Sequence, residues 1–173
     1  MSPSIFKPRI SISKLRSIAG RYPAEYDHEI ESVLAPQVRA RGYFTKPEFE
    51  RMCAWKTPRS KPKVASNSAD YIKAVTQTAL STESEQLRIE ILTLLNGVSW
   101  PTASVILHFC HAEAYPILDF RALWSLGVEA GQVTYTFALW QEYTEVCRTL
   151  AKRSNLSMRE VDRALWKYSE EEQ

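Results

Sequence analysis

The sequence predicts an all-α fold, and three observations favour this class. Apolar residues recur at helical spacing over most of the chain, helix-start signals punctuate these runs, and the 173 residues include only five glycines. Hydrophobic residues make up 45% of the chain and charged residues 24%, which is typical of globular proteins. Length and composition therefore predict one compact unit and exclude collagen-like, mucin-like and wholly disordered chains.

Two helices are expected in the first part of the chain. The first covers residues 24–34, and Pro36 is expected to interrupt or end it. The motif Thr45-Lys46-Pro47-Glu48 combines a capping box with a first-turn proline, so it predicts a helix that ends near Trp55. The inward faces of these helices are expected to hold Tyr26, Ile30, Val33, Leu34, Phe49, Met52 and Cys53.

A proline-rich segment follows. Residues 56–63 are predicted to form an exposed basic loop, because Pro58 and Pro62 remove backbone donors and disfavour helix. Asn67 is expected to cap a helix that runs to Leu80. The inward side chains of this helix are expected to be Ile72, Val75 and Ala79.

The next two helices are predicted to form a hairpin. Thr82 and Glu85 make a capping box, and the helix that they start is expected to end at Asn96-Gly97. Pro101 suits a first helical turn, so a second helix, apolar nearly all round, should run to Cys110. The buried residues of the first helix are expected to be Leu87, Ile91, Leu94 and Leu95.

Three further elements complete the chain. Asp119 is expected to cap a short helix through Leu126. Residues 133–137 have a pattern that also suits an extended segment, before helical spacing resumes up to Leu150. The capping box of residues 157–160 predicts the last helix.

Charge is distributed unevenly along the chain. Residues 1–63 hold 13 Lys and Arg against six Asp and Glu, whereas residues 64–173 hold nine against 14. The densest basic run, residues 39–63, is either a solvated surface or a site for a polyphosphate. The predicted parts are a basic, partly ordered arm at 1–23, a single helical domain at 24–169 and an acidic tail at 170–173.

The sequence favours a cytoplasmic protein without cofactors. It has no apolar run of the kind that a signal peptide or membrane span needs. Cys53, Cys110 and Cys147 are far apart and odd in number, which indicates reduced, buried thiols. His108 and His111 have a spacing that suits a metal, but a third ligand is missing nearby, so packing or surface roles are expected. The tryptophans are expected in the core, apart from Trp100.

The most informative stretch is the hairpin turn around Asn96-Gly97. A turn this short aims backbone N–H groups to one side, beside the positive end of the following helix, where a phosphate oxygen can be held. Gly97 permits a close backbone approach, Val98 is expected to point inward, and Ala103 lets the two helices pack closely. An Asn-Gly turn by itself is also a common structural connection.

This stretch resembles the helix-hairpin-helix DNA glycosylases of the endonuclease III type. Their hairpin reads Leu-Pro-Gly-Val-Gly-x-x-Thr-Ala and is followed by an apolar helix and an apolar step ending in Asp. The resemblance is strong over residues 87–127 and weaker over the helices on either side of the basic loop, so it covers roughly half of the chain. The matching residues are Leu95-Asn96-Gly97-Val98-Ser99-Trp100-Pro101-Thr102-Ala103 and Tyr115-Pro116-Ile117-Leu118-Asp119.

The resemblance implies a helix-hairpin-helix glycosylase-like helical bundle that acts in base excision repair. Asp119 would be the catalytic carboxylate, facing a flipped-out nucleotide and stabilising positive charge on its sugar. Relatives that also cleave the strand carry a lysine where this chain has Pro101, so a monofunctional hydrolase is expected. Only Cys147 follows Asp119, which excludes the iron–sulfur cluster of many relatives. Lys56 or Lys63 remains a remote alternative source of an amine.

The expected partner is double-stranded DNA, bound by a monomer that in a bacterium would be associated with the nucleoid. Trp100 at the hairpin tip is a candidate for stacking on a base or sugar. The DNA-binding residues implied are Gly97, Val98, Ser99, Trp100 and Thr102 in the hairpin and Lys56, Thr57, Arg59, Lys61 and Lys63 in the basic loop.

Two other functions remain open at this point. One is a non-catalytic module on a glycosylase fold that recognises DNA shape or damage, which the missing lysine and the altered glycine favour. The other is a helical protein-interaction domain whose hairpin is merely structural.

Overall fold

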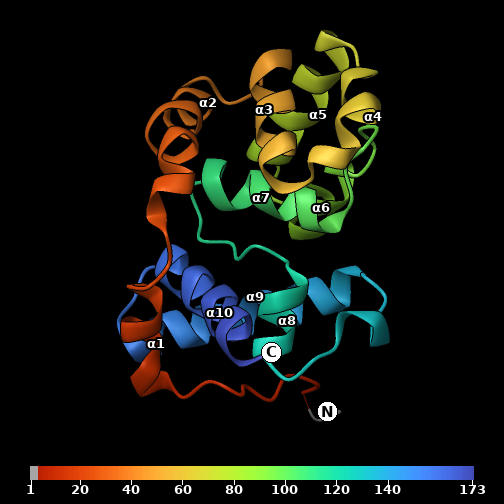
Figure 1. Cartoon of the computed structure of the whole chain (residues 1–173). Helices are drawn as coiled ribbons and strands as arrows, with labels where there is room; N and C mark the ends of the chain where they lie inside the picture. Colours follow the sequence, from red (N-terminus) through yellow and green to blue (C-terminus); the bar gives the residue numbers. More distant parts are fainter. Residues whose placement is uncertain (1–3) are drawn as a thin grey trace. The chain divides into compact units, whose positions relative to one another are not determined.

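The computed structural model describes residues 4–173, and every regular element within them is helical (Figure 1). The prediction of an all-α class is confirmed. Val133 and Thr136 have extended backbone angles, with φ values of −125° and −135°, but no strand forms in the described part of the chain. None of the helices described is long and apolar enough to cross a membrane.

The contacts divide the chain into two compact units. Unit 1 joins the described residues up to Pro23 with Ala114–Gln173, and unit 2 is Ala24–Glu113. The arm predicted at residues 1–23 was drawn from charge, and the single domain from length and composition. The described residues of the N-terminal segment carry an apolar face that is buried within unit 1. Its buried side chains are Phe6, Ile10, Leu15 and Ile18.

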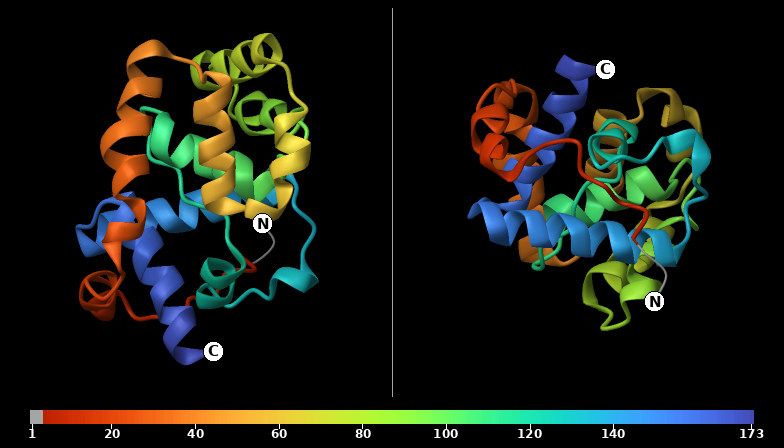
Figure 2. Two further views of the ribbon diagram at one scale, coloured as in Figure 1. Left: turned by 45° about the horizontal axis from the view of Figure 1, so that its top comes forward. Right: turned by 90° about the horizontal axis from the view of Figure 1, so that it is seen from below.

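Unit 2 is built from short helices around a common core. Its α3 packs against α4, α5 and α7, its α6 against α5 and α7, and its α2 against α7 (Figure 2). The capping box and first-turn proline predicted for α3 are both present. The elements are η1 Ala24–Asp27, η2 Ile30–Leu34, α2 Ala35–Arg41, α3 Lys46–Lys56, η3 Pro58–Ser60, α4 Lys61–Ala65, α5 Ala69–Ser81, α6 Glu85–Leu92 and α7 Trp100–Cys110.

Two prolines of unit 2, Pro36 and Pro62, lie in first helical turns, where the sequence predicted an interrupted or ended helix and an exposed loop, respectively. Pro36 lies in the first turn of α2, directly after the π-helix η2, where the N–H of Ala35 bonds to the carbonyl of Ile30. Pro36 has no N–H to donate, and the first turn of a helix is the position where that loss is tolerated. Pro62 lies in the first turn of α4, a position that proline tolerates, so part of the predicted loop is helical.

The caps of two other helices in unit 2 are shifted from their predicted positions. Ser68, not Asn67, caps α5 by accepting a hydrogen bond from the N–H of Tyr71 at 3.2 Å, and Ser84, not Thr82, caps α6. The buried face of α6 shifts accordingly. Ile89, Leu92 and Leu95 are buried there, whereas Leu87 and Leu94 are 43% and 60% exposed.

Unit 1 combines both ends of the chain. Its α10 packs against α1, α8 and α9, and the N-terminal segment lies along the end of α8, where the N–H of Lys7 bonds to Leu126 O at 2.8 Å. The predicted tail at 170–173 is exposed but belongs mostly to α10, whose capping box is present as predicted. The elements are α1 Ile12–Ala19, α8 Phe120–Ser125, η4 Ala130–Gln132, α9 Phe137–Ser154 and α10 Met158–Glu172.

The cysteines and tryptophans differ in burial. All three thiols are free and buried as predicted, and burial raises the pKa values of Cys53 and Cys110 to about 12 and that of Cys147 further.

Among the tryptophans only Trp140 is fully buried. Trp55, Trp124 and Trp166, which were also expected in the core, are partly exposed, and their rings contact cationic or aromatic side chains. Examples are Arg9 over Trp124 and Tyr22 beside Trp166.

Candidate nucleic-acid interface

The hairpin of unit 2 has the local geometry that its sequence suggests. Residues 93–99 connect α6 to α7, with Gly97 at a φ of +81° and Val98 turned inward at 7% exposure. Only glycine adopts such a φ without strain. A Cβ atom on Gly97 would lie 2.7 Å from Cγ2 of Val64, so glycine also allows the turn to approach α4 closely.

Asn67 fastens this hairpin to the segment after α4. Its side chain is 3% exposed and accepts the N–H of Asn96 at 2.8 Å, while its amide nitrogen donates to Asn96 O at 2.9 Å and to Val64 O at 2.8 Å. A buried amide with paired bonds of this kind orders both backbones. Sequence reasoning assigned Asn67 to a helix cap and missed this role, because the partner lies 29 residues away.

The fastened hairpin and the basic segment share an open pocket of about 450 Å³. The hydroxyl of Thr57 also lies 3.4 Å from that of Thr102, which joins the start of the basic segment to the first turn of α7. Lys56, Lys61, Trp100 and Thr102 do not line the pocket. Its lining residues are Thr57, Arg59, Ser60, Lys63, Gly97, Val98 and Ser99.

Four N–H groups of the hairpin and the first turn of α7 have no acceptor among the described residues, and those of Gly97 and Ser99 belong to residues that line the pocket. They belong to Gly97, Ser99, Trp100 and Thr102, whereas Val98 and Ala103 donate to carbonyls of the turn. Pro101 has no N–H. Unpaired donors at the start of an 11-residue helix make a favourable position for an anion.

Ion pairing divides the basic run into two parts. Toward its beginning, Arg39 donates to Phe109 O at 2.6 Å, Arg41 pairs with Glu48, and Arg51 pairs with Glu29. These charges are therefore satisfied within the protein.

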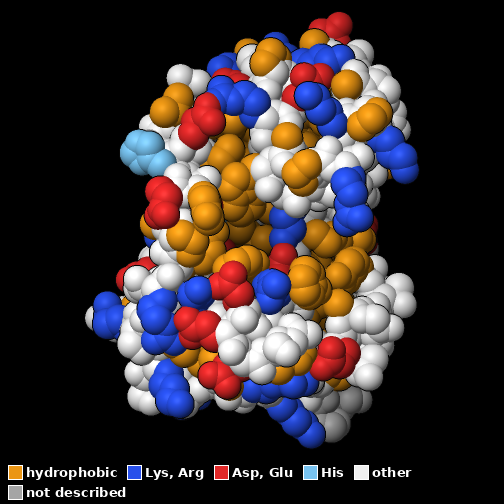
Figure 3. All heavy atoms as spheres, in the orientation of Figure 1, with side chains coloured by type: hydrophobic (Ala, Val, Ile, Leu, Met, Phe, Trp, Pro, Cys, Tyr) orange, Lys and Arg blue, Asp and Glu red, His pale blue; other side chains and the backbone are white. Residues whose placement is uncertain are grey.

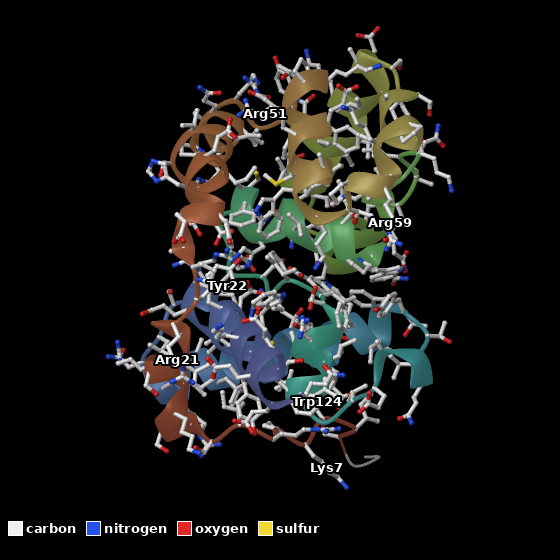
Figure 4. The ribbon with its side chains drawn as sticks, viewed as in Figure 1. Lys7, Arg21, Tyr22, Arg51, Arg59 and Trp124 are labelled. Atoms are coloured by element: carbon white, nitrogen blue, oxygen red, sulfur yellow. The ribbon has the colours of Figure 1, made fainter. Side chains whose placement is uncertain are left out.

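The end of the run is different. Arg59, Lys61 and Lys63 are exposed and pair with no carboxylate in the described part of the chain. Figure 3 shows Lys and Arg side chains at the surface beside α4, and Figure 4 shows Arg59 well away from Arg51 on unit 2. The unpaired positive charge of the run thus lies next to the hairpin N–H groups.

Asp119 belongs to unit 1 and caps α8 as predicted. Its Oδ1 accepts the N–H of Arg121 at 2.9 Å, and its side chain is partly exposed rather than sealed in the core. The apolar step before it is buried and is held by Tyr143, whose hydroxyl donates to Ile117 O at 2.6 Å. A carboxylate on such a rigid support keeps a fixed direction.

Tyr135 is a neighbour of Asp119 that sequence reasoning missed. Partial burial and the negative charge of Asp119 raise the pKa of its phenol, so it stays protonated at neutral pH. No sequence signal marks it, because it lies 16 residues beyond Asp119 in an irregular segment. In the part of the chain that the structure describes, no three His, Cys, Asp or Glu side chains gather into a group that could hold a metal ion.

Comparisons of the chain with protein-family models, curated proteins and solved structures find no match.

Proposed function

We propose that this protein binds double-stranded DNA and acts as a monofunctional DNA N-glycosylase. The observation that carries the proposal is the shared pocket of unit 2. There a hairpin with unpaired N–H groups meets the unpaired end of the basic run, and both were implied by the sequence as DNA-binding segments. These two segments are separated in sequence but line the same pocket. This favours a single site for the phosphate backbone over two unrelated surfaces.

The pocket suits a phosphate group of the DNA backbone. Oxygen atoms of the phosphate would accept the N–H groups of Gly97 and Ser99, while Arg59 and Lys63 supply opposite charge. Such contacts position a duplex without reading its sequence, and they release counterions, so binding weakens as salt rises.

The chemistry would be performed by Asp119. As the N-glycosidic bond of an extruded nucleotide breaks, positive charge builds on the sugar, and a nearby carboxylate lowers the cost of that charge. The carboxylate would also orient the attacking water. Pro101 stands where related enzymes have a lysine, so water takes the base's place on the sugar and an intact strand with an abasic site remains.

The proposal predicts that purified protein releases a base from at least one duplex in a panel carrying single lesions, which alkali then converts into strand breaks. Asp119→Asn should leave duplex binding within about twofold while reducing base release by at least about 100-fold, because the amide carries no charge to stabilise the sugar cation. Normal base release by that variant would refute the role of Asp119.

A second candidate, a non-catalytic DNA-binding module, is favoured by Ser99 and Pro101, which replace a glycine and a lysine of the enzymes that the hairpin resembles. The same panel separates the two. The module binds duplexes, in a salt-dependent manner, without producing abasic sites from any of them. A protein-interaction domain would retain no DNA even at low salt.

A further inference from the structure

Arg121 of unit 1 has an unusual environment for an arginine. The central carbon of its guanidinium lies 5.3 Å from the ring centroid of Phe120 and 5.2 Å from that of Trp166. The guanidinium makes no hydrogen bond or ion pair with any residue from 4 to 173. Its side chain is partly exposed, and Phe120 is 54% exposed, so a ligand can reach the guanidinium.

Two other ring-stacked arginines of unit 1 have acidic partners. Arg9 lies 4.2 Å from the centroid of Trp124 and pairs with Glu129 at 3.1 Å. Arg159 stacks on Tyr22 and pairs with Asp162. Arg121 differs because its guanidinium contacts two aromatic rings but pairs with no carboxylate among residues 4–173.

One of the two rings near Arg121, that of Trp166, is itself packed against another ring. Trp166 of α10 meets the ring of Tyr22 edge-on, with centroids 5.5 Å apart and planes at 83°. Figure 4 shows Tyr22 just after α1, so segments from both ends of unit 1 support the stack. Because aromatic contacts use no N–H donor, they leave the donors of a guanidinium available to a planar or tetrahedral anion.

We propose that Arg121 binds a backbone phosphate of the strand whose extruded nucleotide faces Asp119. This inference rests on the proposed DNA glycosylase function and adds a phosphate site in unit 1 to the one in unit 2. Arg121 follows Asp119 by two residues, and its backbone N–H donates to Oδ1 of Asp119 at 2.9 Å, so the carboxylate is tied to the first turn of the helix that carries Arg121. A guanidinium there offsets the repulsion between that carboxylate and a phosphate, and its two parallel donors match phosphate oxygens.

The test uses two fluorescently labelled duplexes of one sequence, one undamaged and one with a single tetrahydrofuran abasic-site analogue. The wild-type protein should bind the analogue more tightly, because a site that lacks its base has less stacking and pairing to lose when the sugar is extruded. Arg121→Gln should reduce this preference by about tenfold, while affinity for the undamaged duplex stays unchanged. Arg121→Lys should restore part of the preference, since it keeps the charge but loses the planar fork.

Arg9→Gln is the matched control. It removes another ring-stacked arginine of unit 1, but one already paired with Glu129, so the preference should not change. Thermal unfolding checks that each variant is folded. If Arg121→Gln is unfolded, Arg121→Met carries the test, since it removes the charge and keeps an unbranched stem, and a wild-type preference in it together with wild-type stability would overturn the proposal.

The outcomes separate the two proposals. A wild-type protein that binds neither duplex refutes the DNA-binding function and this inference with it. A wild-type protein that binds both duplexes equally, or a folded Arg121→Gln variant that keeps the preference, overturns the role of Arg121 alone.

Discussion

Gly97 and Asn67 show how single residues position the hairpin. Gly97 adopts a left-handed backbone conformation, and its lack of a Cβ atom allows close contact with Val64. Asn67 binds the backbone N–H and carbonyl of Asn96 through two hydrogen bonds. The requirement for glycine was visible in the sequence, because Asn-Gly favours a positive φ. The role of Asn67 was not visible in the sequence, because its hydrogen-bond partner, Asn96, lies 29 residues away.

Gly97→Ala should destabilise the protein by about 1–3 kcal/mol, because a left-handed φ strains alanine and its Cβ would overlap Val64. Denaturant unfolding of the purified variant measures this loss. Gly131→Ala is the control, since Gly131 has no positive φ and no atom within 4 Å of its ideal Cβ. Equal stability of the two variants would contradict the assigned strain.

Among the elements, η3 and α4 matter most for the proposed DNA contact. The segment was predicted to be a loop, but it forms two short helical turns that place Arg59 and Lys63 beside the hairpin. Proline in a first turn made this possible, and the loop prediction was wrong because it treated both prolines as helix breakers.

Arg59→Ala and Lys63→Ala should each lower the slope of log affinity against log salt by about one, if each side chain contacts one phosphate. Fluorescence anisotropy over a series of salt concentrations measures that slope. Arg51→Ala provides the comparison, because Arg51 is already paired with Glu29 and should leave the slope unchanged. An identical slope in all three variants and the wild type would remove Arg59 and Lys63 from the interface.

The start of α10 makes a prediction about pH. The N–H and hydroxyl of Ser157 donate to Glu160 and lower the pKa of its carboxyl, with smaller help from Arg16 and Arg163. A lowered pKa stabilises the fold above the unfolded-state pKa, and this contribution is lost as pH falls through the folded-state pKa. Glu160→Gln should therefore cost about 0.5 kcal/mol at neutral pH, reduced by solvent screening, and almost nothing in strong acid. Unfolding curves at several pH values test this, and a pH-independent difference would contradict it.

At the scale of the whole molecule, the two units have different chain organisation. Unit 2 is one continuous segment with its own buried residues, such as Phe49, Ile72 and Leu92, whereas unit 1 is assembled from both ends of the chain. A continuous segment with a core can fold without the rest of the protein.

The fragment of residues 24–113 should therefore unfold cooperatively and bind undamaged duplex with the salt dependence of the full chain. It should show no preference for the abasic-site analogue, because Asp119 and Arg121 belong to unit 1. Circular dichroism and anisotropy measure the two properties. A fragment that folds but does not bind DNA would refute the placement of the main DNA contact in unit 2.

The sequence by itself determined the helical class, the starts of α3, α7, α8 and α10, the inward Val98 and the buried thiols. These features depend on caps, prolines and apolar spacing within a few residues of one another, so local chemistry is enough to specify them. The tertiary structure alone decided which members of the basic run remain unpaired, what Asn67 binds, and that Arg121 lies near two rings with no acidic partner among residues 4–173. Each of these depends on atoms that folding brings together from distant positions, as with Arg39 and Phe109, 70 residues apart. The spacing of neighbouring residues in the sequence does not predict such partners.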